Sequence, residues 1–187
     1  MIGPMRVDEL LDHLRSGPLH EIYVPGYLDD GDGRVSLPTS ARCFHPMADT
    51  VYLDFGGSLI RCAAFDRRSG GMRLERAPSI VCAFEVDPDD TFAVMPLLRF
   101  ALQTGRDAAK ARRLEVHASE ADEDECVFAA MGVAFDGDDY VFLDPLDFEG
   151  IHVGGKRARD LWISRFGARY LARSFVIGDA GAPSPAP

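Results

Sequence analysis

Two pairs of β-rich runs, each joined by a tight turn, limit the folds open to this chain. Residues 50–55 and 58–65 flank Gly56-Gly57, where two adjacent glycines allow positive φ at both turn positions. Residues 126–135 and 140–143 flank a turn that contains Asp136-Gly137, a dipeptide that favours hairpins. Such short turns join antiparallel neighbours, so the sequence predicts a mostly antiparallel sheet.

Helical patterns occur near both ends of the chain. Four apolar residues recur at helical spacing in the first: Val7, Leu10, Leu11 and Leu14. Residues 156–166 form a second helical pattern, whose apolar face contains Ala158, Leu161, Trp162 and Phe166. We expect Trp162, the only tryptophan, to lie in the core.

Further strands are predicted at residues 19–24, 72–76, 80–86, 114–118 and 148–153. Strands that do not alternate regularly with helices indicate an α+β fold, with a mostly antiparallel β-sheet and two or three flanking helices. We expect a single α+β domain over residues 1–177, followed by a flexible Pro/Ala-rich tail over residues 178–187.

Three segments carry more specific expectations. Pro25-Gly26 is predicted to end the first strand, and residues 26–46 to form a long loop with at most a short strand at 34–37. Residues 50–86 are predicted to form a four-stranded meander. Residues 91–105 fit either a helix or, in their early part, a strand.

One buried charge pair is also predicted. Asp54 lies in an apolar strand and would need a partner if buried, and Arg61 across the hairpin is the candidate.

Bulk features exclude several classes of protein. The longest uncharged, mostly apolar stretch, residues 126–135, is half of the about 20 residues that a bilayer span needs. Charged residues near the N-terminus occupy positions where a signal peptide has an apolar core. None of the four cysteines falls in a C-x-x-C pair, which favours free thiols in a reducing compartment. We therefore expect a cytoplasmic protein that does not bind membranes.

Charge is distributed very unevenly along the sequence. Residues 119–149 hold 11 acidic residues and no basic residue, whereas the whole chain has a formal net charge of −10. This acidic stretch argues against nucleic-acid binding and is suited to attracting a basic partner protein. The residues expected to bind that partner are Asp122, Glu123, Asp124, Glu125, Asp136, Asp138 and Asp139. Two alternatives stay open: a solvated acidic surface with no partner, or internal pairing with the basic segments around Arg112 and Arg157.

Common catalytic and cofactor motifs are missing from the sequence, including the P-loop, G-x-G-x-x-G, H-E-x-x-H and G-x-S-x-G patterns. Residues 30–33 resemble the start of a calcium loop, but Arg34 and Ala41 occupy positions that need oxygen ligands. We therefore predict no catalytic residue, metal or other cofactor. The alternative is a small enzyme or metal-binding protein that uses Cys43, His45 and Asp49 in the long loop.

Two stretches resemble a known group of proteins. They are DTVYLDFGGSLIR at residues 49–61, and DYVFLDP at residues 139–145 continuing to GIHVGG at 150–155 and to Trp162. Together, across residues 49–166, they resemble small bacterial immunity-type proteins, which protect a cell against its own or a neighbour's toxin. The resemblance implies a non-enzymatic protein whose partner is a toxin domain.

Overall fold

The structure is a computed structural model, and it describes residues 4–29, 43–47, 49–65, 71–82, 90–102, 108–119, 127–147 and 150–178. Its helices are α1 (Val7–Ser16), α2 (Leu98–Ala101) and α3 (Lys156–Phe166), with the short 3₁₀ helix η2 (Gly167–Arg169) after α3. The first six strands are β1 (Glu21–Asp29), β2 (Cys43–Pro46), β3 (Thr50–Asp54), β4 (Leu59–Phe65), β5 (Gly71–Ala77) and β6 (Thr91–Pro96). The others are β7 (Ala111–Ala118), β8 (Val127–Phe128), β9 (Ala130–Phe135), β10 (Tyr140–Asp147), β11 (Gly150–Gly154) and β12 (Leu171–Val176). The predicted α+β class, with antiparallel strands and flanking helices, is confirmed.

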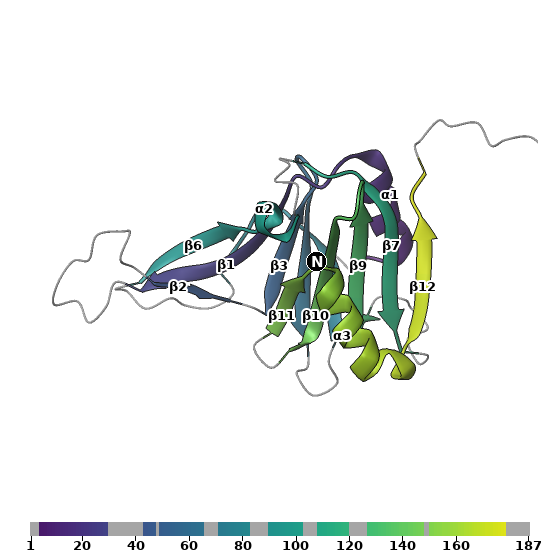
Figure 1. Cartoon of the computed structure of the whole chain (residues 1–187). Helices are drawn as coiled ribbons and strands as arrows, with labels where there is room; N and C mark the ends of the chain where they lie inside the picture. The colour runs from purple at the N-terminus through teal and green to yellow at the C-terminus, as the bar shows by residue number, and fades with distance from the viewer. Residues whose placement is uncertain are drawn as a thin grey trace, which may run out of the picture.

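Two antiparallel sheets form the body of the molecule (Figure 1). The first has the order β2-β1-β3-β4-β5-β8, with β6 also paired to β1, and the second has the order β11-β10-β9-β7-β12. Alternating residues of the second sheet divide between its two faces. Leu114, Val133 and Val141 belong to the main core, which is shared with the first sheet and α1. Tyr140 and Phe142 face the other way and pack with Trp162 of α3.

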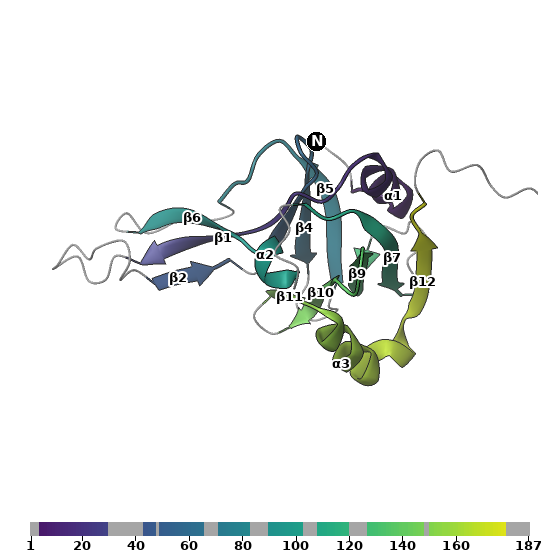
Figure 2. The ribbon, with the colours of Figure 1, turned by 45° about the horizontal axis from the view of Figure 1, so that its top comes forward.

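The two longer helices lie on opposite sides of the second sheet (Figure 2). Helix α1 turns its apolar side chains into the main core, and Val7, Leu10, Leu11 and Leu14 are all buried there, as predicted. Helix α3 covers the outer face, where Trp162 is buried. Leu161, expected on the same apolar face, is 49% exposed, because only one narrow stripe of α3 meets the sheet.

Strand β1 continues beyond the body and pairs with β2 and β6 in a three-stranded ribbon, which we call the arm (Figure 1). The arm consists of residues 24–29, 43–47 and 90–96.

Pro25 does not end β1, contrary to the sequence prediction, because it lies at the point where the strand beside β1 changes from β3 to β2. On one edge of β1, residues 21–23 pair with β3 and residues 26–29 pair with β2, so the N–H that proline lacks has no strand partner on that edge; on the other edge Pro25 lies opposite Val94 of β6. The carbonyl of Pro25 accepts a hydrogen bond from Met47 N instead.

The predicted hairpins are confirmed at both turns. Gly56 and Gly57 have φ of 72° and 112°, and they connect β3 to β4. Gly137 has φ of 80° in the turn between β9 and β10. At these positions a side chain would strain the backbone, which is why the glycine patterns were good guides to the topology.

Long-range pairing bears on three local predictions. The expected loop at residues 26–46 is wrong at both ends, because residues 26–29 extend β1 and residues 43–46 form β2; residues 30–42 lie outside the described chain. Of the strand expected at residues 80–86, residues 80–82 are not in a strand and residues 83–86 lie outside the described chain; β5 pairs with β8, from a distant part of the sequence. Residues 91–105 contain both alternatives in turn, β6 and then the short helix α2.

None of the described helices combines the length and the apolar character needed to cross a membrane.

Replacing Leu10 by alanine tests the contribution of α1 to the core. Leu10 is fully buried, so Leu10→Ala should lower the free energy of unfolding by about 2–5 kcal/mol. Leu161→Ala, on the exposed side of α3, is the matched control and should change it by about 0.5 kcal/mol or less. Urea denaturation of both variants measures the difference, and equal effects would contradict the assigned core.

Candidate functional site

A buried charged cluster lies between the outer face of the second sheet and α3. Glu115 on β7 is at its centre, and Arg159 Nε donates to both of its oxygens, at 3.0 Å to Oε1 and 2.8 Å to Oε2. His117 Nε2 lies 2.8 Å from Oε1, and the Tyr140 hydroxyl donates to Oε2 at 3.1 Å. Both carboxylate oxygens therefore have two partners each, which offsets the cost of burying this charge.

The surroundings of Glu115 fix its ionisation state. Burial by itself would raise the pKa of Glu115, but hydrogen bonds from His117 and Arg159, together with the positive charge of Arg159, outweigh burial and lower the pKa to about 2. Burial and the Glu115 charge raise the pKa of Tyr140, so its hydroxyl stays protonated and can donate. Because an ionised carboxylate only accepts hydrogen bonds, Nε2 of His117 carries the proton in this contact.

Gly132 on β9 makes the cluster possible. In the sheet it lies between Glu115 on β7 and Phe142 on β10. The Tyr140 side chain crosses over Gly132 to reach Glu115, and a Cβ on Gly132 would lie 2.0 Å from the tyrosine hydroxyl oxygen. No other residue leaves this path open, so the missing side chain is as important to the cluster as the charged groups.

Aromatic rings close the cluster beneath α3. The ring centroid of Trp162 lies 4.7 Å from that of His117 and 5.5 Å from that of Tyr170. The predicted core position of Trp162 is thereby confirmed. Within the described residues, Nδ1 of His117 and Nε1 of Trp162 are buried without a hydrogen-bond partner. The packing therefore holds these two rings in place without using their full hydrogen-bonding capacity.

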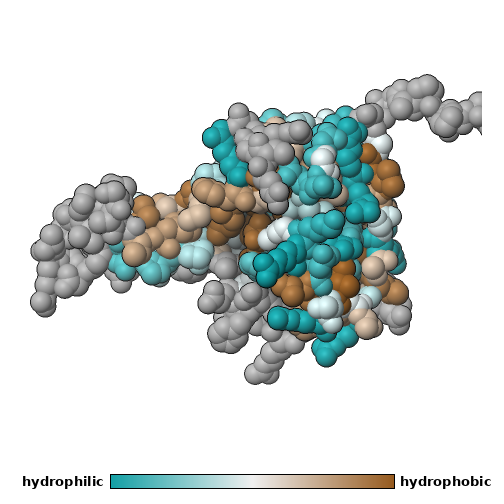
Figure 3. Space-filling model, in the orientation of Figure 1, coloured by the Kyte–Doolittle hydropathy of each residue, from teal (hydrophilic) through white to brown (hydrophobic). Residues whose placement is uncertain are grey.

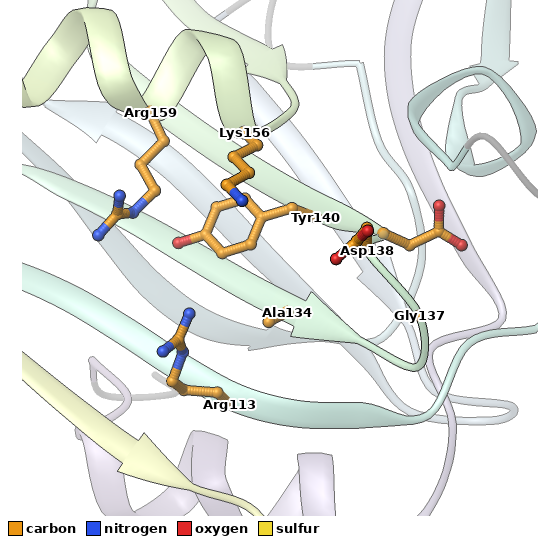
Figure 4. Close-up of a pocket in the computed structure, with 8 residues that line it drawn as sticks. Arg113, Ala134, Gly137, Asp138, Tyr140, Lys156 and Arg159 are labelled. Atoms are coloured by element: carbon orange, nitrogen blue, oxygen red, sulfur yellow. The ribbon is translucent and has the colours of Figure 1, made fainter.

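A pocket of about 120 Å³ adjoins the cluster at the start of α3 (Figure 4). Its charged and phenolic lining residues come from β7, the β9–β10 turn, β10 and α3. They are Arg113, Asp138, Asp139, Tyr140, Lys156 and Arg159. The first turn of α3 carries no acidic residue, the reverse of what the helix dipole favours. The basic character of this end of the helix therefore does not serve helix stability.

The structure divides the residues predicted to bind a partner. Asp136 Oδ1 accepts a hydrogen bond from Arg112 Nε at 2.6 Å, so the alternative of internal pairing applies to this residue. Asp139 is buried, whereas Asp138 is exposed at the rim of the pocket. Asp122, Glu123, Asp124 and Glu125 lie outside the described residues. Binding of a partner by these residues stays a prediction.

The alternative site at Cys43, His45 and Asp49 takes a different form from the one expected. Cys43 and His45 lie on β2, opposite Asp29 and Tyr27 of β1, so these four side chains share one face of the arm. Nε2 of His45 is 3.6 Å from Oδ2 of Asp29, and the His45 ring stacks on Tyr27. The carboxylate beside Cys43 and His45 is therefore that of Asp29 and not, as the sequence predicted, that of Asp49. Among the described residues, no three His, Cys, Asp or Glu side chains are arranged to hold a metal ion.

The predicted pairing of Asp54 with Arg61 is wrong. Arg61 lies opposite Tyr52 on β3 and pairs with Glu75 of β5, while an oxygen of Asp54 accepts from Gly56 N in the hairpin turn. The strand register places Arg61 directly opposite Glu75 of β5 and Tyr52 of β3, and the turn supplies Asp54 with its partner.

The arm presents apolar side chains to solvent (Figure 3). Phe92 of β6 lies opposite Tyr27, so Phe92, Tyr27 and His45 form a row across the three strands. Phe92 is 36% exposed. Aromatic side chains on one face of a projecting ribbon are typical of surfaces that bind proteins.

No known protein family, curated protein or solved structure matches this chain. Function is therefore inferred from the chemistry of the described residues.

Replacing Gly132 by alanine tests the path of Tyr140. The added Cβ forces the tyrosine hydroxyl away from Glu115, so Gly132→Ala should lower the free energy of unfolding by about 1–3 kcal/mol. Gly17→Ala is the control, because a Cβ there meets no atom within 4 Å, and it should be close to neutral. Thermal unfolding of both variants checks the prediction, which fails if their melting temperatures agree.

The low pKa of Glu115 predicts an acid-sensitive fold. The folded-state pKa of about 2 lies below the ordinary value of 4.5, so ionised Glu115 stabilises the protein above about pH 4.5. This stabilisation should disappear as the pH falls from about 4.5 to about 2. Glu115→Gln should be less stable at neutral pH by about 1–3 kcal/mol and should lose less stability over that acidic range. Denaturant titrations at several pH values compare the two slopes; parallel slopes would contradict the assignment.

Proposed function

We propose that this chain is a non-enzymatic binding protein of the bacterial toxin-immunity type, whose partner is a basic protein domain. The observation that carries the proposal is the arm, which extends β1 away from the body with β2 and β6 (Figure 1). A small β-ribbon is stable in water only when it has at least three strands with a hydrophobic face or packs against another element. A partner protein would supply such packing.

The charges of the arm favour a basic partner. Its described residues include the carboxylates of Asp29 and Asp90 and no lysine or arginine. An apolar surface flanked by carboxylates attracts a basic protein by its charge and is then stabilised by burial of its aromatic side chains. The row of Tyr27, His45 and Phe92 is the natural centre of such an interface.

The acidic stretch of residues 119–149 supports the same kind of partner, with fewer residues than the sequence suggested. Asp136 is paired with Arg112 and Asp139 is buried, so the attraction is assigned to Asp138 and to residues 122–125. The described cysteines Cys43, Cys62 and Cys82 form no disulfide with one another.

A catalytic role for Cys43 is the competing proposal, favoured by the position of His45 and Asp29 on its face of the arm. The variant Cys43→Ser distinguishes the binding proposal from the catalytic one. A binding surface tolerates this small change, whereas catalysis by a thiol nucleophile would be lost.

The proposal predicts that a neighbouring gene encodes a large secreted protein whose C-terminal domain is the toxin, and the test is a binding measurement with that domain. Phe92→Ser should weaken binding at least about tenfold, as loss of a central aromatic does. Val176→Ser is the control, because Val176 is even more exposed but lies on β12, away from the arm. Asp138→Asn should slow association at low salt and leave dissociation unchanged.

Each result bears on the proposal. Tight binding that Phe92→Ser weakens, and that Val176→Ser and Cys43→Ser do not, supports it. No binding to that domain, or equal loss in the Phe92 and Val176 variants, overturns it. Loss of toxin protection in Cys43→Ser with binding intact would favour catalysis.

A further inference from the structure

The pocket beside α3 contains positive charges that no described residue neutralises. Arg159 is engaged by Glu115 and by Asp160. Arg113 and Lys156, by contrast, form no ion pair with any residue of the described chain. Figure 4 shows their side chains on either side of the Tyr140 ring, reaching towards it from β7 and α3. Two free cations therefore converge on one end of the pocket.

The acidic residues of the lining do not cancel this charge. Asp139 is buried, and it has interactions of its own. Asp138 is exposed and lies away from Arg113 and Arg159 in Figure 4. The pocket thus has a positive end, with an aromatic wall, and a single exposed carboxylate at its other end.

Size and charge together define the class of ligand. The volume of about 120 Å³ is well below the about 300–1,000 Å³ of pockets that enclose drug-sized molecules, so the pocket fits one small group. Two cations without partners match a doubly charged anion, whereas a single carboxylate would leave one of them uncompensated. A phosphate group carries a charge of about −1.5 to −2 at neutral pH and has several acceptor oxygens.

We propose that this pocket binds a dianionic phosphate group, free or as a monoester, between Arg113 and Lys156 against the Tyr140 ring. Arg159, fixed by Glu115, adds positive charge at the back of the pocket. The site is on α3 and the second sheet, away from the arm, and it shares with the proposed partner surface only Asp138.

Calorimetric titration of the full chain with inorganic phosphate tests the proposal. We expect one phosphate per chain, with Arg113→Gln and Lys156→Gln each weakening binding about tenfold or more. Arg157→Gln is the matched control, since Arg157 is an exposed neighbour of Lys156 on α3 that does not line the pocket. Asp138→Asn should strengthen binding, because it removes a negative charge. All four residues are exposed, so these variants should fold, and circular dichroism checks this.

The pH dependence distinguishes a dianion site from general attraction. Binding of glycerol phosphate should strengthen from about pH 5 to about pH 7.5, because the second pKa of a phosphate monoester is about 6. Binding of inorganic phosphate, whose second pKa is higher, should strengthen over a correspondingly higher range. Sulfate, which is already dianionic over this range, should bind without that change. Tighter binding of glycerol phosphate than of inorganic phosphate would identify a monoester as the ligand, and the reverse order would identify the free ion. The proposal is overturned by absent binding, by equal binding of acetate, or by equal losses in the Arg157 and Lys156 variants.

Discussion

The buried carboxylate of Glu115 is the interaction that organises the second sheet and α3. An ionised group away from water has to be surrounded by donors, and here the donors come from three elements: His117 on the same strand, Tyr140 on β10 and Arg159 on α3. Satisfying this one charge therefore sets the path of the Tyr140 ring, the need for glycine at position 132 and the position of α3 over the sheet. The adjoining pocket is a by-product of the same arrangement, because Tyr140 and Arg159 also line it.

Local features of the sequence were good guides where a few neighbouring residues decide the structure. The apolar spacing of α1, the glycine turns at 56–57 and 137, and the buried Trp162 all follow from short-range pattern or side-chain size. The arm could not be foreseen in the same way, because residues 26–29 become a strand only by pairing with β2 and β6. Pro25 is unfavourable inside a paired strand, and it is tolerated here because it lies where the strand beside β1 changes from β3 to β2.

The charged cluster was missed for a similar reason. Arg159 and Tyr140 lie 44 and 25 residues from Glu115, and nothing local to any of them indicates the contact. One clue was present: Glu115 and His117 alternate with Leu114 and Val116 in a predicted strand, so two polar groups face away from the main core. The helix at residues 156–166 could cover this face, because Arg159 can pair with a carboxylate and Trp162, one turn later, supplies apolar packing. Net charge was also a poor guide to local charge, because a chain with a formal charge of −10 still places two cations beside α3 that have no ion pair among the described residues.

Strand β1 belongs to both the body and the arm, and this limits how the molecule can be taken apart. Its first residues hold β3 in the central sheet, and its last residues carry β2 and β6 outwards. The arm is consequently no detachable module: trimming it back would shorten a strand on which the neighbouring sheet is built, and grafting it onto another scaffold would require a host strand that continues into it. A force applied at the tip would reach the interior through one unbroken length of backbone.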